Sequence, residues 1–181
     1  MIIDRTYFCG DLYLPFSPDD VGTSSLLVSE ERAEFDLYLA EKEDEFLSML
    51  FGNLKEAYVA GRGTSPWVAV DAYVINSDLK TSIIANYVYF RYWNSRQYGI
   101  DDSGTFVKER EKGVVVSNSK KTIDAWNAMI KKILPLLAYL MANRDALIQD
   151  DNDFTNSDWD TFVDGIENNE LQGNYLNEYG L

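Results

Sequence analysis

The segment from Ser77 to Met129 constrains the fold most, because two apolar helical patterns flank a long polar stretch. A helix is predicted over residues 77–98, where Ser77 or Asp78 can serve as the N-cap. Its aliphatic and aromatic side chains cover most of the helix circumference, which requires burial on several sides. Residues 119–149 carry apolar side chains at helical spacing. Between them, residues 99–118 contain glycines, a charged KEREKG run and two short β-prone runs. The pattern predicts two core helices joined by an extended arm, with a hairpin turn at residues 111–113.

A third long helix is predicted over residues 29–51. Ser29 is a suitable N-cap, the first turn is acidic, and Gly52 supplies a stop. Shorter helical pieces are expected at residues 54–60 and 159–166, and residues 64–76 favour a short strand or an irregular link. The predicted fold class is therefore mainly α: a helical bundle of three long helices, with short accessory helices and a β-prone extended arm at about 99–118.

The length of 181 residues is typical of one domain, which divides here into three regions. Residues 1–28 contain two closely spaced prolines and form a predicted extended N-terminal segment. Residues 29–149 form the helical core with the inserted arm at 99–118, and residues 150–181 form an acidic C-terminal tail. Apolar side chains of the two terminal regions are candidates for docking onto a partner: Tyr7, Phe8, Leu12, Leu14, Phe154 and Trp159.

The net charge of −14 is unevenly distributed along the chain. Residues 1–79 contain 15 acidic and 5 basic residues, residues 80–144 contain 5 and 11, and residues 145–181 contain 10 and none. An acidic head, a basic middle and an acidic tail suit a subunit that stacks on copies of itself. The alternative is that the acidic tail only aids solubility. The overall charge argues against nucleic-acid binding by the protein as a whole.

The residue types exclude most catalytic and metal sites. The chain has no histidine and one cysteine, so histidine-dependent triads, histidine-ligated metals and thiolate zinc sites are excluded. No phosphate-binding or dinucleotide-binding glycine motif is present. A calcium loop starting at Asp151 fails, because its twelfth position is Phe162. No apolar run is long enough for a membrane helix. We expect a protein made in the cytoplasm, without enzyme activity, cofactor or membrane association.

The arm contains the candidate subunit interface. The charged residues of the arm, with Lys120 and Lys121 close behind, form the one basic cluster, which suits docking onto an acidic surface of a neighbouring copy or onto a DNA backbone. Interleaved glutamates favour a protein partner, and a solvated loop is the alternative. The candidate interface residues are Phe106, Val107, Lys108, Arg110, Lys112, Val114, Val115 and Val116.

Several segments together resemble neck proteins of tailed bacteriophages of Bacteroides-type hosts and their prophages. Residues 45–52, EFLSMLFG, are similar to that family's "EpeFLxxLLG" segment, and residues 82–92, SIIANYVYFRY, to its "SIxxYYVYxxYL" helix. GTFVK at 104–108 with AWNAM at 125–129 resembles its "tGvvK…AWNxM" block, and residues 7–15 look like its start. The likeness covers about residues 7–130, and the acidic tail departs from the family pattern.

The resemblance implies a structural subunit of a head-to-tail connector in the virion neck. Such subunits form a ring, twelvefold by this resemblance, that joins the portal protein to other neck or tail proteins and extends the DNA channel. DNA would pass through without specific binding. Two alternatives stay open: another virion structural subunit, for tail completion or head decoration, or an acidic regulatory protein that mimics DNA.

Overall fold

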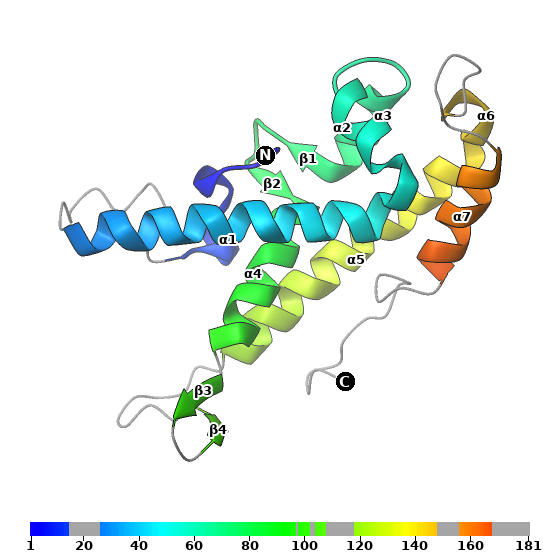
Figure 1. The fold of residues 1–181 in the computed structure, drawn as a ribbon. Helices are drawn as coiled ribbons and strands as arrows, with labels where there is room; N and C mark the ends of the chain where they lie inside the picture. Colours follow the sequence, from blue (N-terminus) through cyan, green and yellow to red (C-terminus); the bar gives the residue numbers. More distant parts are fainter. Residues whose placement is uncertain (15–25, 97, 102–103, 108–117, 148–155, 168–181) are drawn as a thin grey trace.

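The computed structural model describes residues 1–14, 26–96, 98–101, 104–107, 118–147 and 156–167. The described part is mostly helical, which confirms the predicted mainly-α class (Figure 1). The helices are α1 Leu26–Phe51, α2 Lys55–Gly61, α3 Trp67–Val74, α4 Ile83–Arg96, α5 Asn118–Ala142, α6 Arg144–Leu147 and α7 Asn156–Glu167. Two antiparallel strand pairs join β1 Ile75–Asn76 to β2 Thr81–Ser82 and β3 Tyr98–Asp101 to β4 Gly104–Val107. Short 3₁₀ turns cover Arg5–Tyr7, Gly10–Leu12 and Gly52–Leu54.

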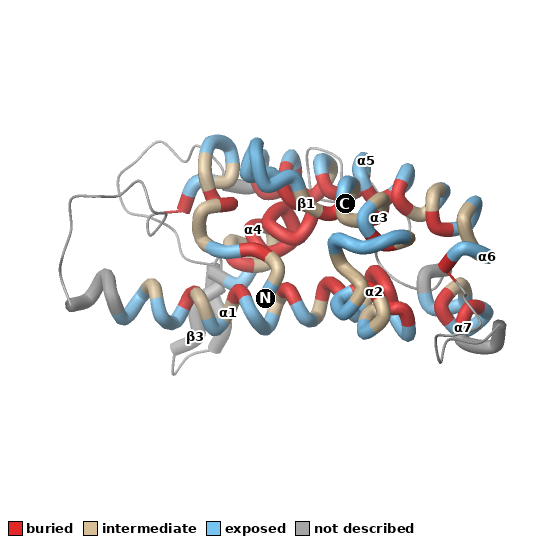
Figure 2. Tube along the Cα trace, turned by 90° about the horizontal axis from the view of Figure 1, so that it is seen from above, coloured by how far each residue is buried: buried red, intermediate tan, exposed pale blue. Residues whose placement is uncertain are grey.

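Helix α4 lies at the centre of the core, as its apolar circumference predicts. Its residues 83–89 are all buried, and Figure 2 shows this stretch between α1 and α5. The ring centroids of Phe46 on α1 and Tyr87 on α4 lie 4.9 Å apart, and those of Phe90 and Trp126 on α5 lie 4.7 Å apart. Burial on two opposite sides explains why this short helix carries so few charges. None of the described helices combines the length and the apolar character that crossing a membrane requires.

The N-terminal segment packs into the same core as the helices. Ile3, Tyr7, Phe8 and Leu14 are all buried, and Phe8 meets Phe35 of α1 edge to face at 5.1 Å between centroids. The buried carboxylate of Glu43 accepts hydrogen bonds from the backbone N–H groups of residues 2 and 3, at 2.6 and 3.0 Å. These contacts attach the described residues 1–14 to the helical core.

Three sequence predictions about the segment between α2 and α4 are wrong. Residues 67–74 form helix α3 instead of a strand or irregular link, with Trp67, Val70 and Val74 buried at helical spacing. Helix α4 begins at Ile83, six residues later than predicted, because residues 75–82 form the β1–β2 pair. Its cap is Ser82, not Ser77: the Ser82 Oγ accepts from the N–H of residue 84 at 3.1 Å.

The ends of the remaining elements also shift. Helix α1 begins at Leu26 rather than at residue 29 and ends at Phe51 as predicted, followed by Gly52 with φ +47°. Strands β3 and β4 form a different hairpin, in which residues 98–101 pair with residues 104–107 and the pair closest to the turn is Asp101 and Gly104. The turn predicted at residues 111–113 lies outside the described residues. Helix α5 ends at Ala142, where the side chain of Asn143 donates to the carbonyl of residue 139 at 2.8 Å.

The acidic tail contains a core element. Helix α7 extends the helical turn predicted at residues 159–166, and its Trp159 and Phe162 are buried with ring centroids 5.2 Å apart. The Arg144 guanidinium lies over the Trp159 ring at 6.0 Å. The helix packs on α1 and on the 3₁₀ turn that follows it. The predicted boundary at residue 150 therefore does not separate α7 from the core.

A polar network joins α1 to α4. The Tyr87 hydroxyl donates to the Glu45 carboxylate at 2.5 Å, the Lys42 ammonium donates to the same carboxylate, and the Arg91 Nε–H donates to the Tyr87 oxygen at 2.9 Å. Burial, together with the hydrogen bond to Glu45, raises the pKa of Tyr87. Burial and the Asp71 carboxylate likewise raise the pKa of Tyr58. Both hydroxyls are thus held protonated in the folded state.

These tyrosines predict loss of stability in alkali. An unfolded tyrosine ionises near pH 10.0, whereas the folded pKa is higher, so their contribution is complete below pH 10 and is lost as the pH rises further. Each tyrosine should remove about 1.4 kcal/mol of unfolding free energy per pH unit above 10. Urea unfolding at pH 8 and pH 11 measures the loss, which should be smaller for Tyr87→Phe than for the natural chain. An identical pH dependence of the two proteins would contradict the prediction.

Candidate functional site

The β3–β4 hairpin is the first candidate site, because it leaves the helical body. It follows α4 almost directly and projects beyond the end of the α4–α5 pair (Figure 1). The register pairs Tyr98 with Val107 and Asp101 with Gly104, so each strand is four residues long. An isolated two-stranded hairpin is marginally stable in water. Among the described residues, each strand has one edge without a partner strand, which suits strand addition by another chain.

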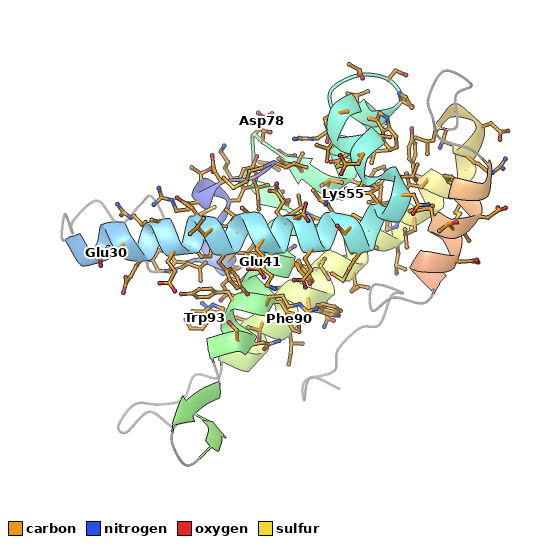
Figure 3. The ribbon with its side chains drawn as sticks, viewed as in Figure 1. Glu30, Glu41, Lys55, Asp78, Phe90 and Trp93 are labelled. Carbon is orange, nitrogen blue, oxygen red and sulfur yellow. The ribbon has the colours of Figure 1, made fainter. Side chains whose placement is uncertain are left out.

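A half-buried aromatic patch lies near the base of the hairpin. It consists of Tyr38 on α1 and of Phe90 and Trp93 on α4, each packed against the core but not covered by it. Figure 3 shows Phe90 and Trp93 at the half of α4 that leads into the hairpin. The buried Trp93 Nε1 has no hydrogen-bond partner of good geometry in the described part of the chain, although the Tyr89 hydroxyl is near. Tyrosine and tryptophan in such positions are typical of protein interfaces.

The structure places two of the predicted interface residues on the hairpin. Phe106 and Val107 lie in β4, paired with Gly99 and Tyr98. The other candidates lie outside the described residues: Lys108, Arg110, Lys112, Val114, Val115 and Val116. The predicted interface thus includes the hairpin, and the aromatic patch beside it was not predicted from the sequence.

Most of the predicted docking residues of the terminal regions are not at the surface of the subunit. Tyr7, Phe8, Leu14 and Trp159 are buried within this chain, and Leu12 is half-buried. Phe154 lies outside the described residues. The aromatic side chains are therefore accounted for by packing inside the subunit, and their surfaces are not open to a partner in this conformation.

A cleft of about 780 Å³ is the second candidate site. The N-terminal segment forms one wall, the turn leading into β2 forms another, and the first half of α5 forms the floor with Asn86 of α4. The lining includes four lysines and two aspartates, which gives the cleft a net positive charge in a strongly acidic chain. The charged lining residues are Lys80, Lys120, Lys121, Lys132, Asp11 and Asp124.

Asn86 gives this cleft a specific polar group. The residue is only 8% exposed and lines the cleft. Its side-chain amide can both donate and accept hydrogen bonds there. Partial burial against the cleft walls lowers the pKa of Lys132, although its side chain remains exposed. The Lys80 ammonium lies over the Tyr7 ring at 5.0 Å.

Among residues whose placement is described, no three acidic or cysteine side chains gather closely enough to hold a metal ion. In the acidic run on α1, Glu41 and Asp44 are exposed whereas Glu43 is buried, and Figure 3 shows Glu41 at the helix surface. The described part of the chain thus offers two recognition surfaces, the hairpin and the cleft, for contacts with other molecules.

Comparison with known proteins finds no matching family model, curated protein or solved structure.

Proposed function

We propose that this chain is a structural subunit of a phage head-to-tail connector. Copies assemble into a ring, twelvefold by the sequence resemblance, that joins the portal to the tail in the virion neck and extends the DNA channel. The observation that carries the proposal is the β3–β4 hairpin, which projects from a helical body beside a half-buried aromatic patch. The resemblance of residues 7–130 to neck proteins is the basis for the identity of the assembly.

The hairpin supports assembly because its own contacts do not suffice to stabilise it. In the described part of the chain the sheet has two strands of four residues, with one edge of each strand open. Three or more strands are needed for independent stability. Strand pairing with a neighbour satisfies one edge through main-chain hydrogen bonds. The aromatic patch supplies apolar area next to those bonds. In protein interfaces, a few buried aromatic side chains contribute much of the association free energy.

The charge distribution supports a conduit for DNA rather than a DNA-binding protein. The net charge of −14 repels phosphate, and a channel lined by such subunits lets DNA slide without adhering. Specific contacts are then confined to proteins: copies of the chain, the portal and adjoining neck or tail proteins. On this proposal the protein is made in the host cytoplasm and acts without cofactor or catalysis.

Proline scanning of the hairpin edges tests the proposal. The pairs next to a two-residue turn alternate in hydrogen bonding, so Ile100 and Thr105 direct their N–H groups toward the open edges. Thr105→Pro or Ile100→Pro removes the outward donor while the inner bonds of the hairpin stay. Each variant removes one hydrogen bond at its edge. On the edge that pairs with a neighbour, the substitution should lower the association constant at least about 5-fold per contact.

The readouts are light scattering and electron microscopy of the purified protein, alone and mixed with particle lysate from its source. Thr105→Val is the matched control, since it keeps both the N–H and β-branching, and circular dichroism verifies that each variant folds. Rings formed equally well by both proline variants would remove the hairpin from the interface. A natural chain that enters no ring and no particle neck would refute the function itself.

A further inference from the structure

The cleft and the acidic end of the molecule lie at opposite ends of α5. The lining residues of α5 fall between Lys120 and Lys132, whereas α6 and α7 adjoin the helix beyond Ala142. A helix rises 1.5 Å per residue, so about 30 Å separates Lys121 from Ala142. Figure 1 shows α6 and α7 at the end of α5 remote from the hairpin.

Between α6 and α7, residues 148–155 have the sequence IQDDNDFT, with three aspartates in four positions and no basic residue. The flanking residues Leu147 and Trp159 are both buried in the core. Eight residues tied at both ends extend at most about 15 Å from their anchors, at roughly 3.5 Å per residue out and back. The segment is therefore too short to reach the part of its own chain's cleft that Lys120 and Lys121 line, about 30 Å away along α5.

We propose that the lysine-lined cleft binds residues 148–155 of a second copy of this chain. The rim lysines complement the aspartates Asp150, Asp151 and Asp153. The Asn86 amide, which has one acceptor and one set of donors, complements a peptide group of the entering segment. A volume of about 780 Å³ accommodates several residues of such a segment.

The geometry of this contact leads to closed assemblies. The two complementary surfaces lie at opposite ends of one molecule, so each copy offers a cleft to one neighbour and an acidic segment to another. Contacts of this head-to-tail kind generate rings when the rotation between copies closes. The inference rests on the proposed function in one respect only, that copies of the chain associate.

Carbodiimide cross-linking of the full-length chain tests the inference. The reagent joins a lysine amine to a carboxylate in direct contact, and a mixture of ¹⁴N- and ¹⁵N-labelled copies separates contacts between copies from contacts within one. At high protein concentration we expect mixed-isotope links from Lys121 or Lys132 to Asp150, Asp151 or Asp153. Links from these lysines only within one copy, or none to these aspartates, would overturn the proposal.

Charge reversal supplies the control. Lys132→Glu should reduce the mixed-isotope links at Lys121 about 10-fold, because it places a carboxylate among the aspartates. Lys131→Glu makes the same charge change one position away, outside the cleft lining, and should leave them unchanged. Equal effects of the two variants would show a general charge effect and refute the cleft. Combining Lys132→Glu copies with Asp151→Lys copies should restore links between the two.

The outcomes separate this contact from the connector function. Rings in the microscope without links between cleft and aspartates would reject the cleft contact and leave the connector proposal in place. Mixed-isotope links in a chain that never joins a particle neck would support the cleft contact and reject the connector proposal.

Discussion

Glu43→Ala should lower the free energy of unfolding by about 2–4 kcal/mol, since it removes a charged acceptor from two backbone N–H groups. The Glu43 side chain is buried, and its two oxygens lie 2.6 and 3.0 Å from the nitrogens of residues 2 and 3. Without it, the two donors are left without a partner. The core contacts of Tyr7 and Phe8 depend on the same attachment, so the whole N-terminal segment should loosen.

Urea unfolding measures the loss, and limited proteolysis locates it: cleavage within residues 1–14 should become faster than in the natural chain. Glu43→Gln retains an uncharged acceptor and should lose about half as much. Glu41→Ala is the matched control, because this exposed glutamate lies on the same helix and its carboxylate forms an ion pair with Lys42, at 3.1 Å. Its effect should stay below about 0.5 kcal/mol. Equal losses in Glu43→Ala and Glu41→Ala would contradict the attachment.

Asp71→Ala should have an effect of similar size, about 2–4 kcal/mol, at the connection between α2 and α3. The Asp71 carboxylate accepts from the Tyr58 hydroxyl at 2.7 Å, from the Arg62 Nε–H at 2.9 Å and from the Gly63 N–H at 3.2 Å. Removing it leaves the hydroxyl of a fully buried tyrosine and a partly buried guanidinium without their acceptor.

This variant also has a spectroscopic signature. The Asp71 carboxylate contributes to the raised pKa of Tyr58, after burial itself, so Asp71→Ala should lower that pKa. An ultraviolet titration of the folded protein should then show one tyrosine ionising at lower pH than before. Asp78→Ala, in the exposed turn between β1 and β2 that Figure 3 labels, is the matched control and should change neither the stability nor the titration. An unchanged titration of Asp71→Ala would contradict the assigned network.

Local sequence signals predicted the structure correctly where a long apolar periodicity matched the packing of the helix. The apolar patterns of residues 77–98 and 119–149 predicted α4 and α5 as core helices, because patterns of this length exceed the noise of single residues. The signals failed between residues 64 and 82. There, β-branched residues suggested a strand, but the packing of Trp67 against Tyr58, at 5.8 Å between ring centroids, stabilises a helix. Either Ser77 or Ser82 can cap a helix, and only the β1–β2 pairing decides between them.

The cleft was beyond prediction from the sequence for a different reason. Its lining combines the N-terminal segment, the turn before β2 and two helices, and no local pattern indicates that these meet. Lys120 and Lys121 were noted as basic residues behind the arm, but Asn86 is one polar residue on an apolar helix. The aromatic residues at the start of the chain were assigned to a partner surface, because the sequence does not distinguish an aromatic residue that packs internally from one that packs on another molecule.

The direct continuation of α4 into the hairpin has a mechanical consequence. A force applied to β3 acts along α4, whose residues 83–89 are buried between α1 and α5 (Figure 2). Pulling on the hairpin therefore requires either separating its strands or displacing a buried helix of the subunit. An assembly joined through such hairpins would be stiff under tension, with its weakest point at the strand pairing and its resistance to shear set by the helical interior.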